Sequence, residues 1–300
     1  MTDRVNVAVI VASRDRPEMV ERCLASLRAA LRPGDELVLV DSASADPLAY
    51  SNVAASHSAH LVRLDVPGVN RARNAGWRST SADLVLFTDD DVEVALDWAD
   101  AFVEAFAHDP RAGFLTGRLD SPEGQDGTVA TTEGTEEKVL TSGTRGVLGH
   151  GASMAVRREV LDQIGGWDDA LGAGGRFRSA PELDVFDRVF AAGWHGRYVP
   201  ASLAEHHQWR TDNEVAKLHF RYAMGAGARM AKLQRTDRQR LRMAVREYWW
   251  DWGVHDVWLN LKARYKRGTV VALLRLVGFG AGYLEARTTP VVGGHFQPRR

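Results

Sequence analysis

The chain has little cysteine and no long apolar run. Its single cysteine, Cys23, excludes an intrachain disulfide and fits a reducing compartment. No stretch reaches the roughly 20 apolar residues that a membrane-spanning helix needs. The first apolar run, Val5 to Ala12, is too short for a secretory signal and leads directly into charged residues. The sequence therefore predicts a cytoplasmic protein without a membrane-spanning helix.

The net charge is close to zero, at −1 over 300 residues, but the positive and negative residues are unevenly distributed along the chain. Up to His207 there are 20 Lys or Arg against 32 Asp or Glu, and from Gln208 onward there are 18 against 7. A basic C-terminal region suggests an anionic surface or partner, although the same charges would also serve to solvate helix faces. With 45% hydrophobic and 26% charged residues, the chain has the composition of a soluble globular protein.

Apolar runs alternate with helical patterns in the first third of the chain. Strands are predicted at 5–12, 36–40, 61–64 and 84–88, and helices after Pro17, over about 70–79 and around Trp98. This alternation is typical of βαβ units and a largely parallel sheet. Residues 119–146 show no period and are predicted to form a long loop. A strand over 147–156, a helix over 159–164 and helices from 214 onward follow.

Three consecutive carboxylates, Asp89, Asp90 and Asp91, follow the apolar run 84–87. In open α/β folds ligands bind at the carboxyl ends of the strands, and Mg²⁺ or Mn²⁺ prefers carboxylate and phosphate oxygens. The pattern therefore predicts a metal site for a phosphate-bearing substrate. The alternative is a helix start, where Asp binds free backbone N–H groups. Three adjacent carboxylates repel one another, which favours a site with a countercharge.

Polar residues also end the first two strands, at 13–16 and 41–44. Because parallel strands end at one edge of the sheet, these residues are expected to lie near the three carboxylates. Arg71 and Arg73 precede the acidic cluster, and their guanidinium groups suit phosphate oxygens. Surface ion pairs are the alternative for both arginines.

In this order and spacing, eight motifs across residues 5–210 resemble those of family 2 glycosyltransferases of GT-A fold. They are Val5-Asn6-Val7-Ala8-Val9-Ile10-Val11, Asp15-Arg16-Pro17, Leu39-Val40-Asp41-Ser42, Ala72-Arg73-Asn74-Ala75-Gly76, Phe87-Thr88-Asp89-Asp90-Asp91-Val92, Met154-Ala155-Val156-Arg157-Arg158, Gly165-Gly166-Trp167-Asp168 and His206-His207. The resemblance implies an α/β, Rossmann-like GT-A fold with a mostly parallel central sheet flanked by helices. It also implies a nucleotide-diphosphate sugar donor, with a UDP- or dTDP-sugar expected, and Mn²⁺ or Mg²⁺ as cofactor. The acceptor is left open among a glycan, a lipid-linked sugar and a small molecule.

Carried over residue by residue, the resemblance assigns roles at the donor site. Asp41 and the Asp15 region would contact the nucleotide base, and Arg73 the base or diphosphate. Asp89 would contact the ribose or the metal, and Asp91 is the favoured direct metal ligand. Asp90 is grouped with the nucleotide contacts, or serves only the turn. His206, or else His207, would help to hold the metal or diphosphate, with a structural histidine as the alternative.

An inverting transfer also needs a general base that takes the proton of the acceptor hydroxyl. The family usually supplies it from a Glu-Asp pair, whereas this chain has Pro181-Glu182 at the matching place. Glu182 is the predicted base, with Asp184 as the backup and a first-turn helix carboxylate as the alternative for Glu182. The loop residues Trp167 and Asp168 are predicted to line the acceptor or sugar pocket, although Trp167 would fit the core equally well.

The C-terminal region, 211–300, is predicted to be a basic, Trp-rich helical extension of a catalytic domain over 1–210. Its tryptophans at 249, 250, 252 and 258 lie among many Lys and Arg residues. Amphipathic rings beside cations suit the inner face of a membrane. Packing on the catalytic domain or on a second subunit is an equal alternative, and nucleic acid is disfavoured because no binding module accompanies the charge.

The sequence thus predicts a cytoplasmic, metal-dependent, inverting glycosyltransferase of cell-envelope, polysaccharide or natural-product glycosylation. A non-catalytic nucleotide-sugar binder and a nucleotidyltransferase on a similar scaffold are the alternatives.

Overall fold

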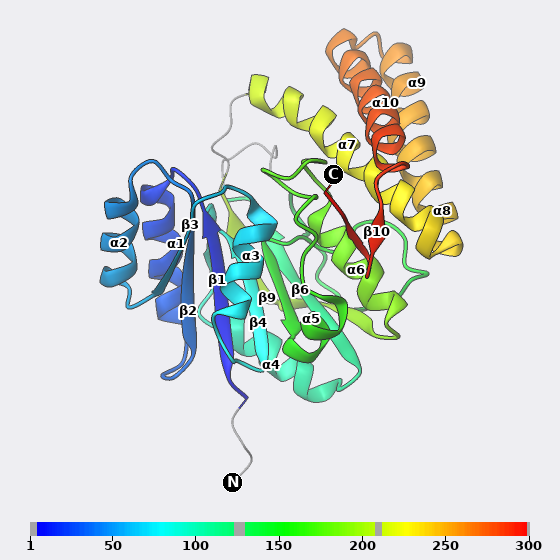
Figure 1. The fold of residues 1–300 in the computed structure, drawn as a ribbon. Helices are drawn as coiled ribbons and strands as arrows, with labels where there is room; N and C mark the ends of the chain where they lie inside the picture. The colour runs from blue at the N-terminus through cyan, green and yellow to red at the C-terminus, as the bar shows by residue number, and fades with distance from the viewer. Residues whose placement is uncertain (1–4, 123–129, 208–211, 299–300) are drawn as a thin grey trace.

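A central β-sheet organises the molecule, as the computed structural model shows for residues 5–122, 130–207 and 212–298 (Figure 1). Its nine strands are β1 (Val7–Ser13), β2 (Glu36–Ser42), β3 (His60–Leu64), β4 (Leu84–Asp89), β5 (Val92–Val94), β6 (Ala112–Asp120), β7 (Lys138–Leu140), β8 (Ser153–Arg157) and β9 (His195–His206). The spatial order is β3-β2-β1-β4-β8-β6-β9-β5, with β7 paired to β9. A separate hairpin joins β10 (Val291–Val292) to β11 (His295–Phe296).

The sheet is mixed but mostly parallel. Strands β1 to β4, β6 and β9 run in one direction, whereas β5, β7 and β8 run against their neighbours. Strand β1 lies between β2 and β4, and its register pairs Ser13 with Asp41 and Ala12 with Asp89. Three strand ends therefore meet at one edge, as the sequence predicted, and the expected α/β fold is confirmed.

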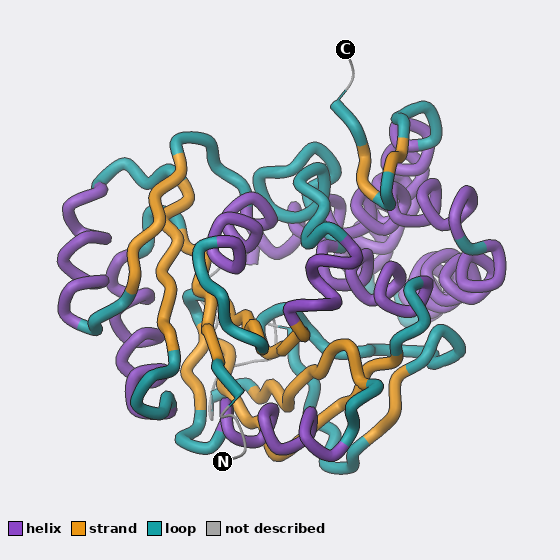
Figure 2. The backbone as a smooth tube through the Cα atoms, turned by 60° about the horizontal axis from the view of Figure 1, so that its bottom comes forward, coloured by secondary structure: helices purple, strands orange, loops and turns teal. Residues whose placement is uncertain are grey.

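Helices cover both faces of the sheet (Figure 2). They are α1 (Pro17–Ala30), α2 (Pro47–Ser56), α3 (Val69–Arg78), α4 (Trp98–His108), α5 (Arg158–Ile164) and α6 (Pro181–Ala191). Proline opens α1, α2 and α6, where its missing N–H costs nothing. At the start of α2 the Asp46 carboxylate also accepts hydrogen bonds from the backbone N–H groups of Leu48 and Ala49.

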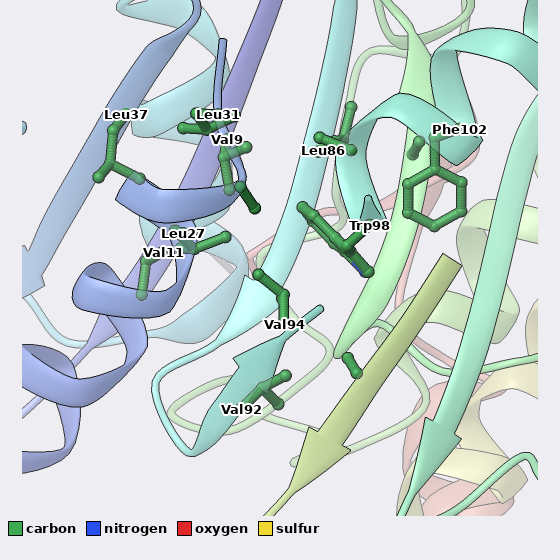
Figure 3. Packing of buried hydrophobic residues seen from close by; sticks show 14 of the residues in the cluster. Val9, Val11, Leu27, Leu31, Leu37, Leu86, Val92, Val94, Trp98 and Phe102 are labelled. Carbon is green, nitrogen blue, oxygen red and sulfur yellow. The ribbon is translucent and has the colours of Figure 1, made fainter. Parts of the chain in front are cut away.

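Alternate residues of β1 build two separate cores. Val7, Val9 and Val11 point into a cluster under α1, α2 and α4, where Trp98 and Phe102 are fully buried (Figure 3). Ala8 and Ile10 point to the opposite face, under α3, α5 and α6. A continuous apolar run is what a strand buried on both faces requires.

Six strands, β5, β6, β7, β9, β10 and β11, were not predicted, and one was predicted too long. The sequence did not predict β6 and β9 because glycine, charged residues and proline interrupt their apolar patterns. The strand expected over 147–156 begins only at Ser153. The predicted loop 119–146 contains β7 and a bridge between Leu119 and Thr132, whereas its residues 123–129 lie outside the described part of the chain.

The C-terminal region is helical, as predicted, and lies at one end of the sheet (Figure 1). It contains α7 (Asp212–Thr236), α8 (Arg238–Val245), the π-helix η1 (Arg246–Val254), α9 (His255–Lys262) and α10 (Lys266–Ala286). One stretch, Gly268–Ala286, is long and apolar enough to cross a membrane by length and composition. This corrects the expectation that no stretch would qualify, because the glycines and alanines near the end of α10 extend its apolar run.

Candidate active site

All three consecutive carboxylates form ion pairs with arginines of this chain, Asp91 through a longer contact of 3.8 Å between its Oδ2 and Arg16 Nη1. Asp89 Oδ1 lies 2.7 Å from Arg73 Nη2, and Asp90 Oδ1 lies 2.9 Å from Arg16 Nη2. Asp90 is buried, and its burial raises the pKa to about 7, with the charges of Asp91 and Asp89 adding to the rise and that of Arg16 opposing it. The countercharge expected for this cluster is thus supplied in part by side chains. Arg16 was not singled out by the sequence, although it stands at the end of β1.

Asp91 contacts the residues at the end of β9. Its Oδ1 lies 3.3 Å from His206 Nε2, and its backbone carbonyl accepts a hydrogen bond from His207 N. His206 Nδ1 lies 3.1 Å from the Ala130 carbonyl. Burial acts to lower the pKa of His206, but the hydrogen bond and the charge of Asp91 outweigh it and raise the pKa. The structure therefore brings together Asp91 and His206, whereas the His207 ring pairs with Glu93 instead.

The donor atoms at this edge suit a hard divalent cation. Asp91 offers oxygen and His206 offers nitrogen, and Asp89 has a side chain that is 35% exposed. Among the described residues, no group of three His, Cys, Asp or Glu side chains stands in a metal-binding arrangement. Mg²⁺ and Mn²⁺ sites often use only one or two carboxylates and take the remaining ligands from substrate phosphates and water. The residues present fit such a cation.

The ends of β1 and β2 are connected by hydrogen bonds of Asp15 and Asp41. Ser44 Oγ accepts from Asp15 N at 2.9 Å, and Asp15 Oδ1 accepts from Ala45 N at 2.8 Å. Asp41 is buried, accepts a hydrogen bond from Ser44 N at 2.8 Å and forms an ion pair with Arg63. Arg63 was missed by the sequence analysis, because only the pairing of β2 with β3 brings it beside Asp41.

Arg73 has unused hydrogen-bonding capacity. Its side chain is 5% exposed, and its guanidinium carbon lies 4.6 Å from the ring centre of Trp167. Apart from the Asp89 contact, its Nε and Nη1 have no hydrogen-bond partner among the described residues. Buried guanidinium nitrogens normally find acceptors, so these two nitrogens stand out as unsatisfied donors.

Trp167 and Asp168 are buried side chains at the wall of a cavity of about 600 Å³. Trp167 is 1% exposed and packs edge-on against Phe87 at 5.2 Å between ring centres. The Asp168 carboxylate lies 2.5 Å from Lys232 Nζ and accepts a hydrogen bond from Phe296 N at 2.9 Å. The burial of Trp167 agrees with the alternative of a core position, and the role of the two residues in an acceptor or sugar pocket stays a prediction.

Glu182 stands in the first turn of α6, directly after Ala180 and Pro181. Ala180 has φ of 61°, in the left-handed region that costs a non-glycine residue about 1 kcal/mol. Within the described residues the half-buried Glu182 carboxylate makes no hydrogen bond or ion pair. Burial lowers the pKa of the nearby His150, and the charge of Glu182 only partly offsets this. The charges of His206 and Asp89 also affect the pKa of His150, a residue that no sequence motif indicated.

Asp184 faces away from this site. It is buried, with Oδ1 2.6 Å from Lys232 Nζ and Oδ2 2.9 Å from Arg188 Nε. Burial acts to raise its pKa, but the charges of Lys232 and Arg188 outweigh it and hold the pKa below its usual value. The structure therefore gives Asp184 a structural ion pair and disfavours it as the backup base.

Comparison with known proteins decides the family. The model of glycosyl transferase family 2 matches residues 8–165, which is more than half of the chain. The chain belongs to glycosyl transferase family 2. The fold agrees with this assignment, because the chain resembles a mannosyltransferase, PcManGT of Pyrobaculum calidifontis, solved with GDP-Man and Mn²⁺. That match has a TM-score of 0.65 and 19% identity, and covers 95% of this chain and 88% of the other.

A second resemblance in fold is to the S. aureus TarS fragment 1-349, with a TM-score of 0.60, 13% identity and 98% and 96% of the two chains covered. In sequence, the chain is 26% identical over 227 residues to a pre-mycofactocin glycosyltransferase of Mycobacterium tuberculosis, covering 72% of this chain and 46% of that protein. The chain thus spans about half the length of that relative. It is also 26% identical over 250 residues to the N-acetylglucosaminyl-diphospho-decaprenol L-rhamnosyltransferase of the same organism, covering 69% and 77% of the two chains.

Proposed function

We propose that this protein transfers a sugar from a nucleotide-diphosphate donor to an acceptor hydroxyl with inversion. Membership of glycosyl transferase family 2 supports transfer as the reaction class. The main support for a donor site here is the buried guanidinium of Arg73, which has two unpartnered nitrogens among the described residues. This group pairs with Asp89, which is close in sequence to Asp91 of the Asp91–His206 pair. A diphosphate would give these nitrogens the acceptors that they lack.

The proposed step is a single displacement. The acceptor oxygen attacks the anomeric carbon as the bond from that carbon to the diphosphate oxygen breaks, and the nucleoside diphosphate leaves. Glu182 takes the acceptor proton, for which its unpaired carboxylate is suited. Asp91, with His206 and Asp89, would hold Mn²⁺ or Mg²⁺, and the cation would stabilise the charge of the departing diphosphate.

The test begins with donor binding. UDP-, dTDP- and GDP-sugars are screened by thermal shift with Mn²⁺, because a ligand that binds only the folded state raises the melting temperature. GDP-mannose is included because the Pyrobaculum calidifontis neighbour was solved with it. Acceptors then include a polyprenyl-diphosphate sugar, the class in the name of one M. tuberculosis relative. We expect release of a nucleoside diphosphate with transfer.

Two variants test the base. Glu182→Gln should lower kcat by about 100-fold or more while donor binding persists, since a general base contributes that much. Glu159→Gln, an exposed carboxylate in the first turn of α5, is the matched control and should leave kcat unchanged. Unchanged turnover in Glu182→Gln would refute the base. Donor binding without turnover on any acceptor would favour the non-catalytic binder, and release of pyrophosphate would favour the nucleotidyltransferase.

A further inference from the structure

An apolar stripe runs along the outer side of α10. Its side chains, here called the outer stripe, are between 38% and 62% exposed and recur at helical spacing: Val270, Leu273, Leu274, Val277 and Leu284. The opposite side of the helix, with Ala272, Gly278 and Gly282, is buried. A surface helix normally buries its apolar side and exposes polar residues. This helix exposes apolar residues over four turns, which indicates a partner for that side.

Cations and aromatic rings surround the turn that joins α9 to α10. Lys262, Arg264 and Lys266, here called the basic turn, are all exposed. Trp258 is 54% exposed, and Lys262 Nζ lies 5.1 Å from the centre of its ring. The sequence contains no Asp or Glu between Val257 and Leu284. The partner must therefore accept apolar groups and positive charge on the same surface.

The polar contacts of α10 favour a helix that lies in a membrane surface over one that crosses the membrane. Near its middle, Arg275 Nη1 lies 2.7 Å from Asp256 Oδ2 of α9, and Arg275 Nη2 lies 3.2 Å from His219 Nδ1 of α7. A crossing helix would carry this charged group into hydrocarbon, where it is costly. Contact with α7 is also close, since a Cβ added at Gly282 would lie 1.9 Å from the Met224 carbonyl oxygen. Only the outer side is free.

We propose that the outer stripe and the basic turn bind the headgroup region of an anionic lipid bilayer. Apolar side chains would enter the boundary between headgroups and acyl chains, Trp258 would lie at that boundary, and the basic turn would contact lipid phosphates. A second copy of the chain fits less well. In a two-fold dimer the same patch meets itself, and a patch without carboxylates gives its cations no partner. The proposal does not depend on the reaction that the site performs.

Cosedimentation of the full chain with vesicles tests this. One set contains phosphatidylcholine alone, and the other contains equal parts of phosphatidylcholine and phosphatidylglycerol. The wild type should pellet with the anionic set at low salt and be released as salt rises, because salt screens the attraction. Replacing Lys262, Arg264 and Lys266 together by Gln should weaken partitioning about 100-fold, given three cations near the surface.

The apolar contribution is tested by Leu273→Asp with Val277→Asp, which should abolish pelleting. Leu48→Asp, at a residue of α2 that is 72% exposed, is the matched control and should pellet like the wild type. Equal melting temperatures of all variants would exclude misfolding, and nucleotide-sugar binding without vesicles keeps this result separate from the proposed reaction.

Three results would overturn the proposal. The first is no pelleting of the wild type at low salt. The second is pelleting that resists both high salt and alkaline carbonate, which would indicate a spanning helix. The third is a dimer in light scattering that Val277→Asp dissociates while no variant or wild type binds vesicles, which would assign the surface to a second copy.

Discussion

Lys232 connects the C-terminal helices to the loop and helix that surround the candidate site. Its ammonium group, with a side chain 4% exposed, lies 2.5 Å from Asp168 Oδ2 and 2.6 Å from Asp184 Oδ1. Both carboxylates are also buried, so replacement of the lysine leaves two buried charges with fewer partners. Lys232→Met keeps much of the side-chain volume and removes the charge. We therefore predict a large loss of stability from this single change.

The magnitude follows from the burial. Removal of one partner of a buried ion pair costs about 3 to 5 kcal/mol. At roughly 2.1 cal/mol/K of unfolding entropy per residue, 300 residues give a fall in melting temperature of about 5 to 8 °C. Asp184 retains Arg188 and Asp168 retains two backbone N–H groups, which favours the lower end.

Differential scanning fluorimetry of Lys232→Met against the wild type measures the effect. Lys262→Met, at an exposed lysine of α9, is the matched control, and a surface change of this kind is expected within about 0.5 kcal/mol. If Lys232→Met melts within a degree of the control, the buried ion pair does not carry the stability assigned to it and the reasoning is refuted.

Two further predictions concern stability. Because the pKa of Asp184 is lowered in the folded state, its carboxylate contributes stability above the ordinary carboxyl pKa of about 3.9, and this stability is lost as pH falls through the lower folded value. The difference in melting temperature between the wild type and Asp184→Asn should therefore shrink below about pH 4. A constant difference down to acid unfolding would contradict this. Gly282→Ala should destabilise by about 1 to 3 kcal/mol in urea unfolding, because its Cβ would meet the Met224 carbonyl at 1.9 Å. Gly280→Ala, where a Cβ meets nothing within 4 Å, should be neutral or stabilise by up to about 1 kcal/mol, and equal effects would argue against close packing of α7 on α10.

Local pattern was enough to predict the strands that position the acidic cluster. Val7 to Ser13 and Leu84 to Asp89 are continuous apolar runs with polar ends, and burial on both faces leaves few alternatives for such runs. The resemblance to a family further indicated that His206 would lie near Asp91, which is where β9 ends beside β5.

Partners that depend on topology could not be predicted in this way. Arg63 becomes the counterion of Asp41 only because β2 and β3 are adjacent in the sheet, and Arg16 becomes that of Asp90 only because β1 and β4 are adjacent. Lys232 is one of two lysines in α7, and its two carboxylates come from segments about 50 residues or more away. The helical spacing of the residues in α10 likewise distinguishes two sides of this helix. It does not indicate which side packs against α7.

The predicted boundary near residue 210 follows a change in composition, and buried ion pairs connect the two sides of it. Lys232 of α7 contacts Asp184 of α6, and Arg229 and Arg240 contact Asp187 of the same helix. The first turn of α6 carries Glu182, so the inner side of the extension fixes the helix that presents the candidate base. Tyr248 of η1 is half-buried and packs against the buried cluster of Met230, Leu233 and Ala244, and α9 and α10 follow η1 directly with the proposed lipid-binding surface. The surface proposed to bind a membrane is therefore continuous, through packed helices, with the residue proposed to accept the proton of the acceptor.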